Sequence, residues 1–474
     1  MCQTAYHPSP LGKNRLHRAR LELGSRDGPF GGLRKRDWIM FAPYCADAGV
    51  PRFVTASFQG RRRLRITNVR GEILGSVVLK GRHTPAPADA LENGVTTEPT
   101  GMLEIPPETP AGVYFVDNEW AFVVSRAEAS CTVVLPVSTM QAFNLWGGRN
   151  AYTERNRQRE TGPRLALHHY SLRRPLARRF ATDVLDGFLD WVPRGAIAGE
   201  HIRFIPDYDL ARSEALGGTK LLLIPGRSEY WSRKSRRAVD AYVENGGDVM
   251  LLSSETMLHE IEHEDDRIVW RWWGSAKNPN SPATPYWYDR ARKYPLTPSI
   301  GPNPQYGGSH KPEAKRHPEW GVYRVHDARS PLAKACDLKA CDTIAMPSIA
   351  YYDGLPVRWY ERGVPMLDER VLPFYRWTLL AHSFGSDTPL RHIGAWFAFQ
   401  RAPSSGRVVH FGSYSWSTME GLGGQGGSGT RPAEVVDATI RMLRSGAELF
   451  GPQQMSAPVP LQVRLKSLLR RGVP

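Results

Sequence analysis

The clearest pattern of apolar and polar positions lies in residues 219–256, where it predicts a strand, a helix and a second strand. Residues 221–224 form a continuous apolar run, which is typical of a strand buried on both faces. Ser232 is a favourable N-cap for the helix, and Gly246 can end it because glycine adopts positive φ at no steric cost. Residues 249–252 form the next strand, so the two strands are expected to be parallel with a right-handed crossover.

Polar side chains follow both predicted strands. Glu229 and Tyr230 come just after the first strand, and Ser254 and Glu255 come just after the second. Ligands of open parallel sheets bind outside the carboxyl ends of the strands, so we expect two carboxylates on one side of the sheet. The structural alternative is that Glu229 merely pairs with a local arginine such as Arg233.

The segment before residue 131 has a different pattern, with short alternating runs and no helical period. These runs predict an immunoglobulin-like β-sandwich over residues 41–130, preceded by a basic, loosely ordered arm at 1–40. The strands predicted in this segment are 64–69, 73–79, 112–116 and 120–124.

From Cys131 onward, buried strands alternate with amphipathic helices, which predicts an α/β doubly wound parallel sheet over 131–455. A helix is expected from Leu176 to about Trp191, and a last helix over 432–449. Residues 456–474 are predicted to be a basic C-terminal tail.

Composition narrows the class of protein. The chain has 474 residues, 41% of them hydrophobic, and a net charge of +15. No apolar run reaches the length of a membrane span, and the first residues lack a secretory core, so we expect a cytoplasmic protein. Five cysteines, an odd and sparse set, agree with a reducing compartment. Much of the basic excess lies at the two ends without a recognition motif, so no specific nucleic-acid binding is expected.

Two familiar motifs are present in contexts that do not suit them. Residues 259–263 read His-Glu-Ile-Glu-His, the zinc-protease pattern, but that pattern requires a helix. The surrounding residues predict a strand, on which the two histidines would stand about 13 Å apart. Residues 421–426 match the spacing of a dinucleotide-binding loop, yet they lie inside a longer glycine-rich run without an adjoining strand and helix.

Several motifs taken together resemble the large (beta) subunit of N,N-dimethylformamidase, in its C-terminal domain. They are Gln-Ala-Phe-Asn-Leu-Trp-Gly-Gly at 141–148, Ser-Leu-Arg-Arg-Pro at 171–175, Ser-Glu-Tyr-Trp-Ser at 228–232, and Gly-Gly-Asp-Val at 246–249. The resemblance covers about 131–450. It implies a class I glutamine amidotransferase-like fold without the amidotransferase cysteine.

The resemblance also implies a mononuclear iron, held by tyrosines and a glutamate, that hydrolyses a small amide. Iron would polarise the carbonyl and acidify a bound water, and oxygen ligands suit it. The glutamate carries over to Glu229, and Tyr152 is a possible phenolate ligand, so these two are the expected metal ligands. A small partner subunit or a homo-oligomer is also possible on this basis.

The chain departs from the family pattern at four positions of the expected site. Arg227 replaces a histidine, Phe143 a tyrosine, Glu255 an asparagine and Tyr351 a glutamate. A cationic Arg227 two residues before Glu229 disfavours a metal and favours an anion or an ion pair.

The sequence therefore leaves two functions open. The first is a metal-dependent amidase-type hydrolase of non-peptide C–N bonds in a small-molecule substrate. The second is a non-catalytic or repurposed relative that binds an anionic or carbohydrate ligand. The expected catalytic residues are Glu229, Glu255 and Tyr152, and the expected pocket residues are Asn144, Trp146, Arg227, Tyr230 and Asp353.

Overall fold

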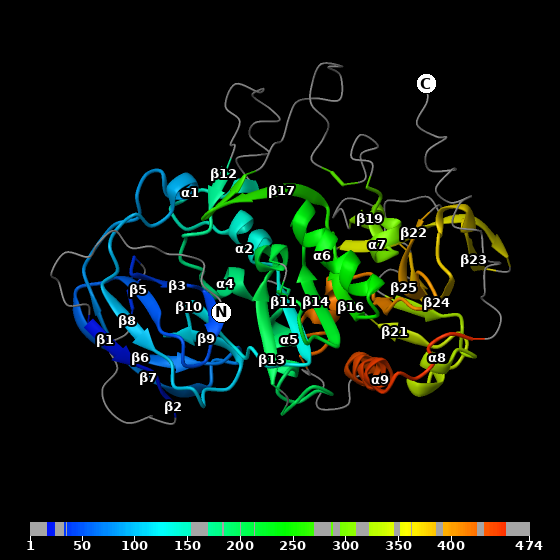
Figure 1. The fold of residues 1–474 in the computed structure, drawn as a ribbon, viewed down its shortest axis with the longest axis horizontal. Coiled ribbons are helices and arrows are strands. Elements are labelled where there is room, and N and C mark those ends of the chain that lie inside the picture. Colours follow the sequence, from blue (N-terminus) through cyan, green and yellow to red (C-terminus); the bar gives the residue numbers. More distant parts are fainter. Residues whose placement is uncertain are drawn as a thin grey trace, which may run out of the picture.

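The fold is a set of mixed β-sheets with few helices (Figure 1), seen in a computed structural model. Strands account for more of the described chain than helices do. The two N-terminal sheets, in blue in Figure 1, lie at one end of the molecule, and a large sheet fills the rest. The structure describes residues 17–23, 33–34, 36–152, 169–182, 184–199, 201–212, 214–269, 286–287, 294–309, 322–345, 351–361, 363–384, 392–423 and 431–451.

The N-terminal region consists of a four-stranded and a six-stranded sheet that share one core. Val54 from the first sheet and Leu64 and Phe122 from the second belong to this core. The four-stranded sheet has the order β1 (His17–Arg20), β8 (Gly101–Glu104), β5 (Arg52–Ser57), β3 (Trp38–Ala42). The six-stranded sheet has the order β2 (Glu22–Leu23), β7 (Ile73–Gly81), β6 (Gly60–Thr67), β9 (Gly112–Val116), β10 (Trp120–Ser125), β4 (Cys45–Asp47).

Part of the expected N-terminal arm is built into these sheets. Strand β1 pairs with β8, and β2 pairs with β7. Ala19, Leu21 and Trp38 are buried, with 6%, 1% and 4% of their surface exposed. The expectation of a loose arm over 1–40 is therefore wrong for residues 17–23 and 38–40, because these few apolar side chains are enough to close the core.

The large sheet has parallel strands at one end and antiparallel strands at the other. Strands β13, β11, β14, β16 and β26 are parallel neighbours, as the strand–helix–strand pattern predicts for β14 and β16. Strands β25, β24, β20 and β21 continue the sheet in antiparallel fashion, and β22, paired with β19 and β23, branches from β25. Their bounds are β13 (Ile202–Pro206), β11 (Cys131–Leu135), β14 (Leu221–Arg227), β16 (Asp248–Ser254), β26 (Arg407–His410), β25 (His392–Gln400), β24 (Arg376–Ser383), β20 (Val322–Val325), β21 (Thr343–Ala345), β19 (Asn303–Ser309), β22 (Tyr351–Glu361) and β23 (Val364–Leu367).

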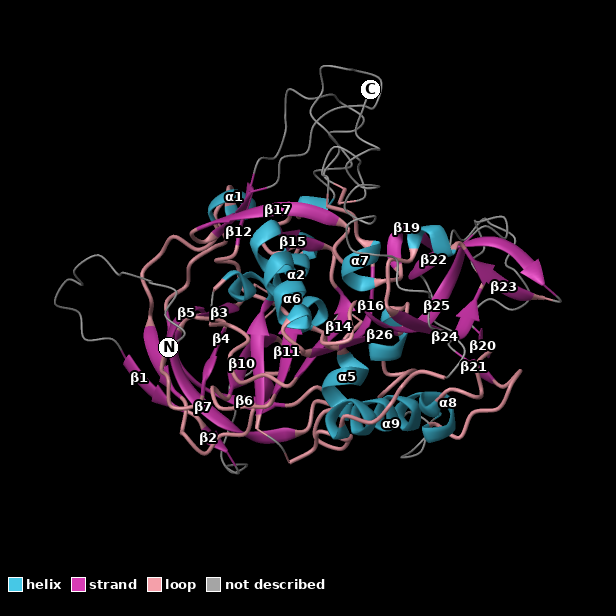
Figure 2. Cartoon of the chain, turned by 45° about the vertical axis from the view of Figure 1, so that its right-hand side comes forward, coloured by secondary structure: helices cyan, strands magenta, loops and turns pink. Residues whose placement is uncertain are grey.

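Two helices on opposite faces explain the uninterrupted apolar run of β14. Leu222 and Ile224 share a core with Val239 of α6 (Arg233–Glu244). Leu221 and Leu223 belong to the other core, which includes residues of α9 (Arg431–Ser445). Figure 2 shows α6 and α9 on opposite sides of the sheet. Side chains alternate between the faces of a strand, so both alternating sets must be apolar here.

The Ser232 cap and the Gly246 stop of α6 are both confirmed. The Ser232 hydroxyl accepts the backbone N–H of Ser235 at 3.0 Å, and Gly246 has a φ of +92°. By contrast, the helix expected over 176–191 is broken into α4 (Arg178–Ala181) and α5 (Asp186–Trp191). Gly187 lies against the Thr418 carbonyl, where a Cβ would stand at 1.7 Å from the oxygen, and this close approach fixes the path of α5.

A fourth sheet has the order β12 (His169–Ser171), β18 (Arg267–Val269), β17 (His259–Glu264), β15 (Tyr230–Ser232). The zinc-protease pattern lies on β17, so its expected strand conformation is confirmed. His259 is stacked on Tyr230 at 5.0 Å between ring centroids. No helix in the described part of the chain is long and apolar enough to cross a membrane.

Candidate functional site

The candidate site lies where the parallel strands β14 and β16 end. Arg227 and Ser254 are register partners at these ends, so Glu229 and Glu255 leave neighbouring strands on one side of the sheet. The turn after β14 is fixed by α2 (Val137–Phe143), because the Thr139 hydroxyl accepts the backbone N–H of Glu229 at 3.0 Å. The predicted convergence of the two carboxylates therefore occurs.

The Arg227 guanidinium stands between the two glutamates. Its Nε lies 3.7 Å from Glu229 Oε1 and 3.5 Å from Glu255 Oε2. The side chains of Glu229, Arg227 and Glu255 are 4%, 17% and 19% exposed, so the pairs are largely shielded from solvent. The structural alternative, in which Glu229 pairs with a local arginine, is therefore realised by Arg227 and not by Arg233, which binds Glu260 at 2.9 Å.

Aromatic rings surround the same guanidinium. Its carbon lies 5.2 Å from the ring centroids of Phe143, Tyr351 and Tyr414, a distance typical of cation–π contacts. Tyr152 is stacked on Phe143 with 5.0 Å between centroids. We call Phe143, Tyr152, Tyr351 and Tyr414, with the three charged side chains, the Arg227 cluster.

Both tyrosines over Arg227 are protonated at neutral pH. Burial raises the pKa of Tyr414 to about 12, although the Arg227 charge and hydrogen bond oppose the shift. Burial also raises the pKa of Tyr351. Arg227 Nη2 lies 3.3 Å from the Tyr414 oxygen, which accepts its hydrogen bond. The Tyr414 hydroxyl therefore keeps its proton and can donate it to a ligand.

Asp353 holds the backbone turn that carries Glu255. It accepts the backbone N–H groups of Glu255 and Thr256 at 2.8 and 3.1 Å and is fully buried. Glu255 has a φ of +54°, a conformation that L-residues adopt reluctantly, so these two hydrogen bonds hold a strained turn. Burial raises the pKa of Asp353, and burial lowers the pKa of the neighbouring His410 to about 3. His410 Nε2 is 3.5 Å from Asp353 Oδ2 and is neutral at physiological pH.

Three of the predicted pocket residues make structural contacts. The Asn144 amide donates to Gln141 Oε1 and to the Pro175 carbonyl, both at 2.9 Å. Trp146 packs edge-on against Trp38 of the N-terminal core, and Tyr230 is stacked on His259. None of these three contacts the guanidinium of Arg227 in the described interactions, so their role as ligand-binding residues stays a prediction.

Sequence reasoning missed Tyr414. It follows β26, which is the parallel neighbour of β16, so it reaches the same sheet edge as Glu255. A strand near 408–411 is legible as an apolar run, but its pairing beside 249–252 is a long-range contact that the local pattern does not give.

The residues present do not fit the iron site that the resemblance implies. Phe143 offers no oxygen where the family has a tyrosine, and the Arg227 cation already lies against Glu229. A metal cation would be repelled by this guanidinium. Among the described residues, no three histidine, cysteine or carboxylate side chains are grouped to hold a metal, so an ion would also depend on tyrosine ligands.

Comparison with known proteins places the chain in a family. The model of the family described as "N,N-dimethylformamidase beta subunit-like, C-terminal" matches residues 80–423. The chain belongs to this family, and the resemblance found in its motifs is confirmed. The match begins upstream of Cys131, inside the N-terminal sheets. No curated protein has a sequence that matches this chain.

Solved structures with partial similarity include β-galactosidases. That of the Antarctic haloarchaeon Halorubrum lacusprofundi is 13% identical with a TM-score of 0.32, and the alignment covers 69% of this chain and 31% of that one. The enzyme of Bacillus circulans sp. alkalophilus is 11% identical with a TM-score of 0.30, covering 69% and 32%. That of Rahnella sp. R3 is 13% identical with a TM-score of 0.30, covering 68% and 32%. The chain spans about a third of the length of these proteins.

Proposed function

We propose that this protein is a metal-independent hydrolase of C–N bonds in small amides, in which Arg227 takes the place that the family resemblance gives to iron. The observation that carries the proposal is the guanidinium held 3.7 and 3.5 Å from Glu229 and Glu255. A fixed cation beside a carboxylate supplies the two elements that hydrolysis needs, which are an electrophilic group and a base.

The chemistry follows from these two groups. The substrate carbonyl oxygen accepts a hydrogen bond from the guanidinium, and Glu229 takes a proton from a water molecule. The resulting hydroxide adds to the carbonyl carbon, and Arg227 stabilises the oxyanion that forms. The C–N bond then breaks as Glu229 returns its proton to the nitrogen, so that amide and water give a carboxylic acid and an amine.

The other members of the Arg227 cluster have supporting roles. Glu255 balances the guanidinium from the second strand end, at 3.5 Å, and keeps it in place. Tyr414 retains its proton and can donate a hydrogen bond to the leaving nitrogen. Tyr152 is stacked on Phe143 and is proposed as a second proton donor. The rings give apolar surfaces that suit small alkyl groups on the nitrogen.

The finer features of the fold are part of the same proposal. We assign the parallel strands β13, β11, β14, β16 and β26 to a glutamine amidotransferase-like unit over 131–455, supported by their parallel order and by the helices on both faces. We assign the two N-terminal sheets to an immunoglobulin-like sandwich that includes strands before residue 41 as well as the expected 41–130, supported by their shared core. A cytoplasmic location and a partner subunit or homo-oligomer stay predictions.

The test is turnover of small amides by protein dialysed against a strong chelator. We expect release of ammonia or amine from formamide, acetamide or N,N-dimethylformamide. Glu229→Gln should lower kcat at least about a hundredfold, because removing a general base typically has this effect. The matched control is Glu262→Gln, since Glu262 is an exposed glutamate of β17. Turnover that survives Glu229→Gln would contradict the role of Glu229.

A second function is a carbohydrate-binding site without catalysis. The rings around Arg227 favour it, because aromatic faces pack against the apolar face of a sugar. An anionic ligand is less suited, since two glutamates against one arginine leave the cluster negative when both are ionised. Absence of turnover with every amide, together with a change in tryptophan or tyrosine fluorescence on adding a sugar, would favour this second function.

A further inference from the structure

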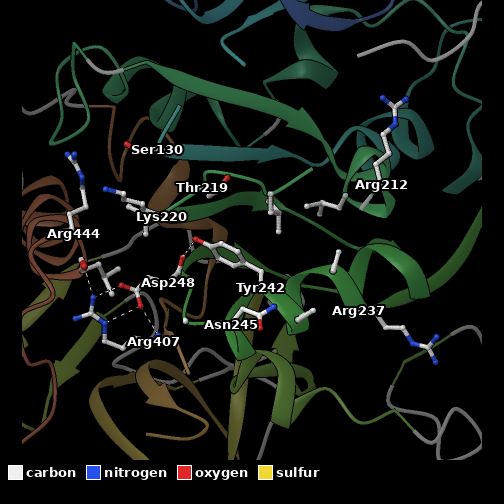
Figure 3. Close-up of a pocket in the computed structure, with 18 of the residues that line it drawn as sticks. Ser130, Arg212, Thr219, Lys220, Arg237, Tyr242, Asn245, Asp248, Arg407 and Arg444 are labelled. Atoms are coloured by element: carbon white, nitrogen blue, oxygen red, sulfur yellow. Dashed lines mark hydrogen bonds and ion pairs between the residues drawn. The ribbon is translucent and has the colours of Figure 1, made fainter. Parts of the chain in front are cut away.

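A large cavity lies at the opposite edge of the sheet from the Arg227 cluster. It has a volume of about 1020 Å³ and is lined by the residues where β14 and β16 begin, including Lys220 and Asp248. The C-terminal ends of α6 and α9 close it, at Asn245 and Arg444 (Figure 3). The proposed hydrolase does not use this cavity.

The lining of the cavity is strongly basic. Six lysine or arginine side chains contribute to it, against one acidic side chain, Asp248. Asp248 is already neutralised, because Arg407 forms a two-pronged ion pair with it. Arg212 is partly neutralised by Asp209, 3.3 Å away. Three further cations stand at the rim on exposed residues, Lys220, Lys234 and Arg237, and Arg444 adds a basic side chain beside them.

Helix ends do not cancel this charge. The C-terminal end of a helix carries about half a negative unit charge, so α6 and α9 together contribute about one. The three exposed cations Lys220, Lys234 and Arg237 exceed that amount. Figure 3 shows Lys220 and Arg444 on one side of Tyr242 and Arg237 on the other. The positive charge is therefore extended along the cavity rather than gathered at one point.

We propose that this cavity binds a small ligand that carries several phosphate groups. The volume is at the upper end of ligand sites, which suits a molecule of nucleotide size. Lysine and arginine are the residues that proteins use for phosphate, and separated cations match separated phosphate groups. The half-buried ring of Tyr242 offers a flat surface for an attached organic group.

The experiment is calorimetric titration of the full chain with inorganic tripolyphosphate and with ATP, in low-salt buffer. Both probes should bind. Lys220→Gln/Arg237→Gln should weaken binding of each probe by about 25-fold, because one unit charge about 4 Å from a phosphate in water is worth about fivefold. The matched control is Arg61→Gln/Lys339→Gln, which removes the same charge from exposed positions outside the cavity. Thermal unfolding is measured first, to show that every variant is folded. The affinities of the variants are then compared.

Each outcome of the titration either supports or overturns the proposed phosphate site. Loss of affinity in the cavity variant alone supports the site, and ATP binding tighter than tripolyphosphate assigns it to a nucleotide rather than to a bare phosphate chain. No binding of either probe at millimolar concentration overturns the proposal. Equal weakening in the cavity variant and the control also overturns it, because the effect would then come from the net charge of +15.

Discussion

Replacing Arg227 with methionine tests whether the guanidinium holds the site together. Methionine keeps an apolar side chain of similar length beside Phe143 and Tyr351 but removes the guanidinium that lies over their rings and between Glu229 and Glu255. Breaking a buried ion pair by removing one partner costs about 3–5 kcal/mol, because the remaining charge is left uncompensated. Arg227 and Glu255 are 17% and 19% exposed, and solvent screening there brings our expectation to about 3 kcal/mol.

The assay is urea unfolding at pH 7, with the free energy extrapolated to water. The control is the triple variant Arg227→Met/Glu229→Gln/Glu255→Gln, which removes the stranded charges as well. We expect the triple variant to regain most of the lost stability, because a neutral cluster has no charge to desolvate. A loss below about 1 kcal/mol in Arg227→Met, or a triple variant no more stable than the single one, would refute the reasoning.

Three further predictions concern residues around and beyond the site. Asp353→Asn should lower the free energy of unfolding by about 1–3 kcal/mol in urea, because one of the two backbone N–H groups of the Glu255 turn loses its acceptor; unchanged stability would contradict this role. Val184→Gly should raise the thermal midpoint, because a β-branched residue with a φ of +54° is strained by about 1 kcal/mol; a lower midpoint would argue against strain. Burial lowers the pKa of His410 from 6.5 to about 3, so the unfolded chain binds the extra proton first and stability should fall as the pH drops from 6.5 toward 3. His410→Asn should flatten this part of the stability profile, and an unchanged slope would show that other groups cause it.

The sequence predicted correctly the helices and strands that are specified by residues close together in the chain. The β14–α6–β16 unit was readable because its apolar run, its Ser232 cap and its Gly246 stop agree with one another. The helix expected over 176–191 is interrupted between α4 and α5, where Val184 has a φ of +54°, outside the range of an α-helix. Apolar spacing continues through this point, so the sequence pattern does not reveal the break.

The sequence predicted site residues only where it also predicted which strands are neighbours in the sheet. Glu229 and Glu255 were placed together because both follow strands of one recognisable unit. Tyr414 follows β26, which pairs with β16, and Tyr351 begins β22, which pairs with β25. Both positions depend on long-range pairing that the pattern does not encode. Asn144, Trp146 and Tyr230 belong to family motifs, and Tyr230 also follows the first predicted strand. Their contacts with Gln141, Trp38 and His259 are long-range or local packing that the sequence pattern did not predict, and their role in ligand binding stays a prediction.

Iron content is the most direct test of the central claim that Arg227 replaces the metal. We would measure iron by elemental analysis in the purified protein and in Glu229→Ala, beside amide turnover by both. The account predicts far less than one iron per chain in either protein, with turnover by the wild type unchanged after chelation. Near-stoichiometric iron that is lost in Glu229→Ala, accompanied by the colour of tyrosinate–iron charge transfer, would contradict it.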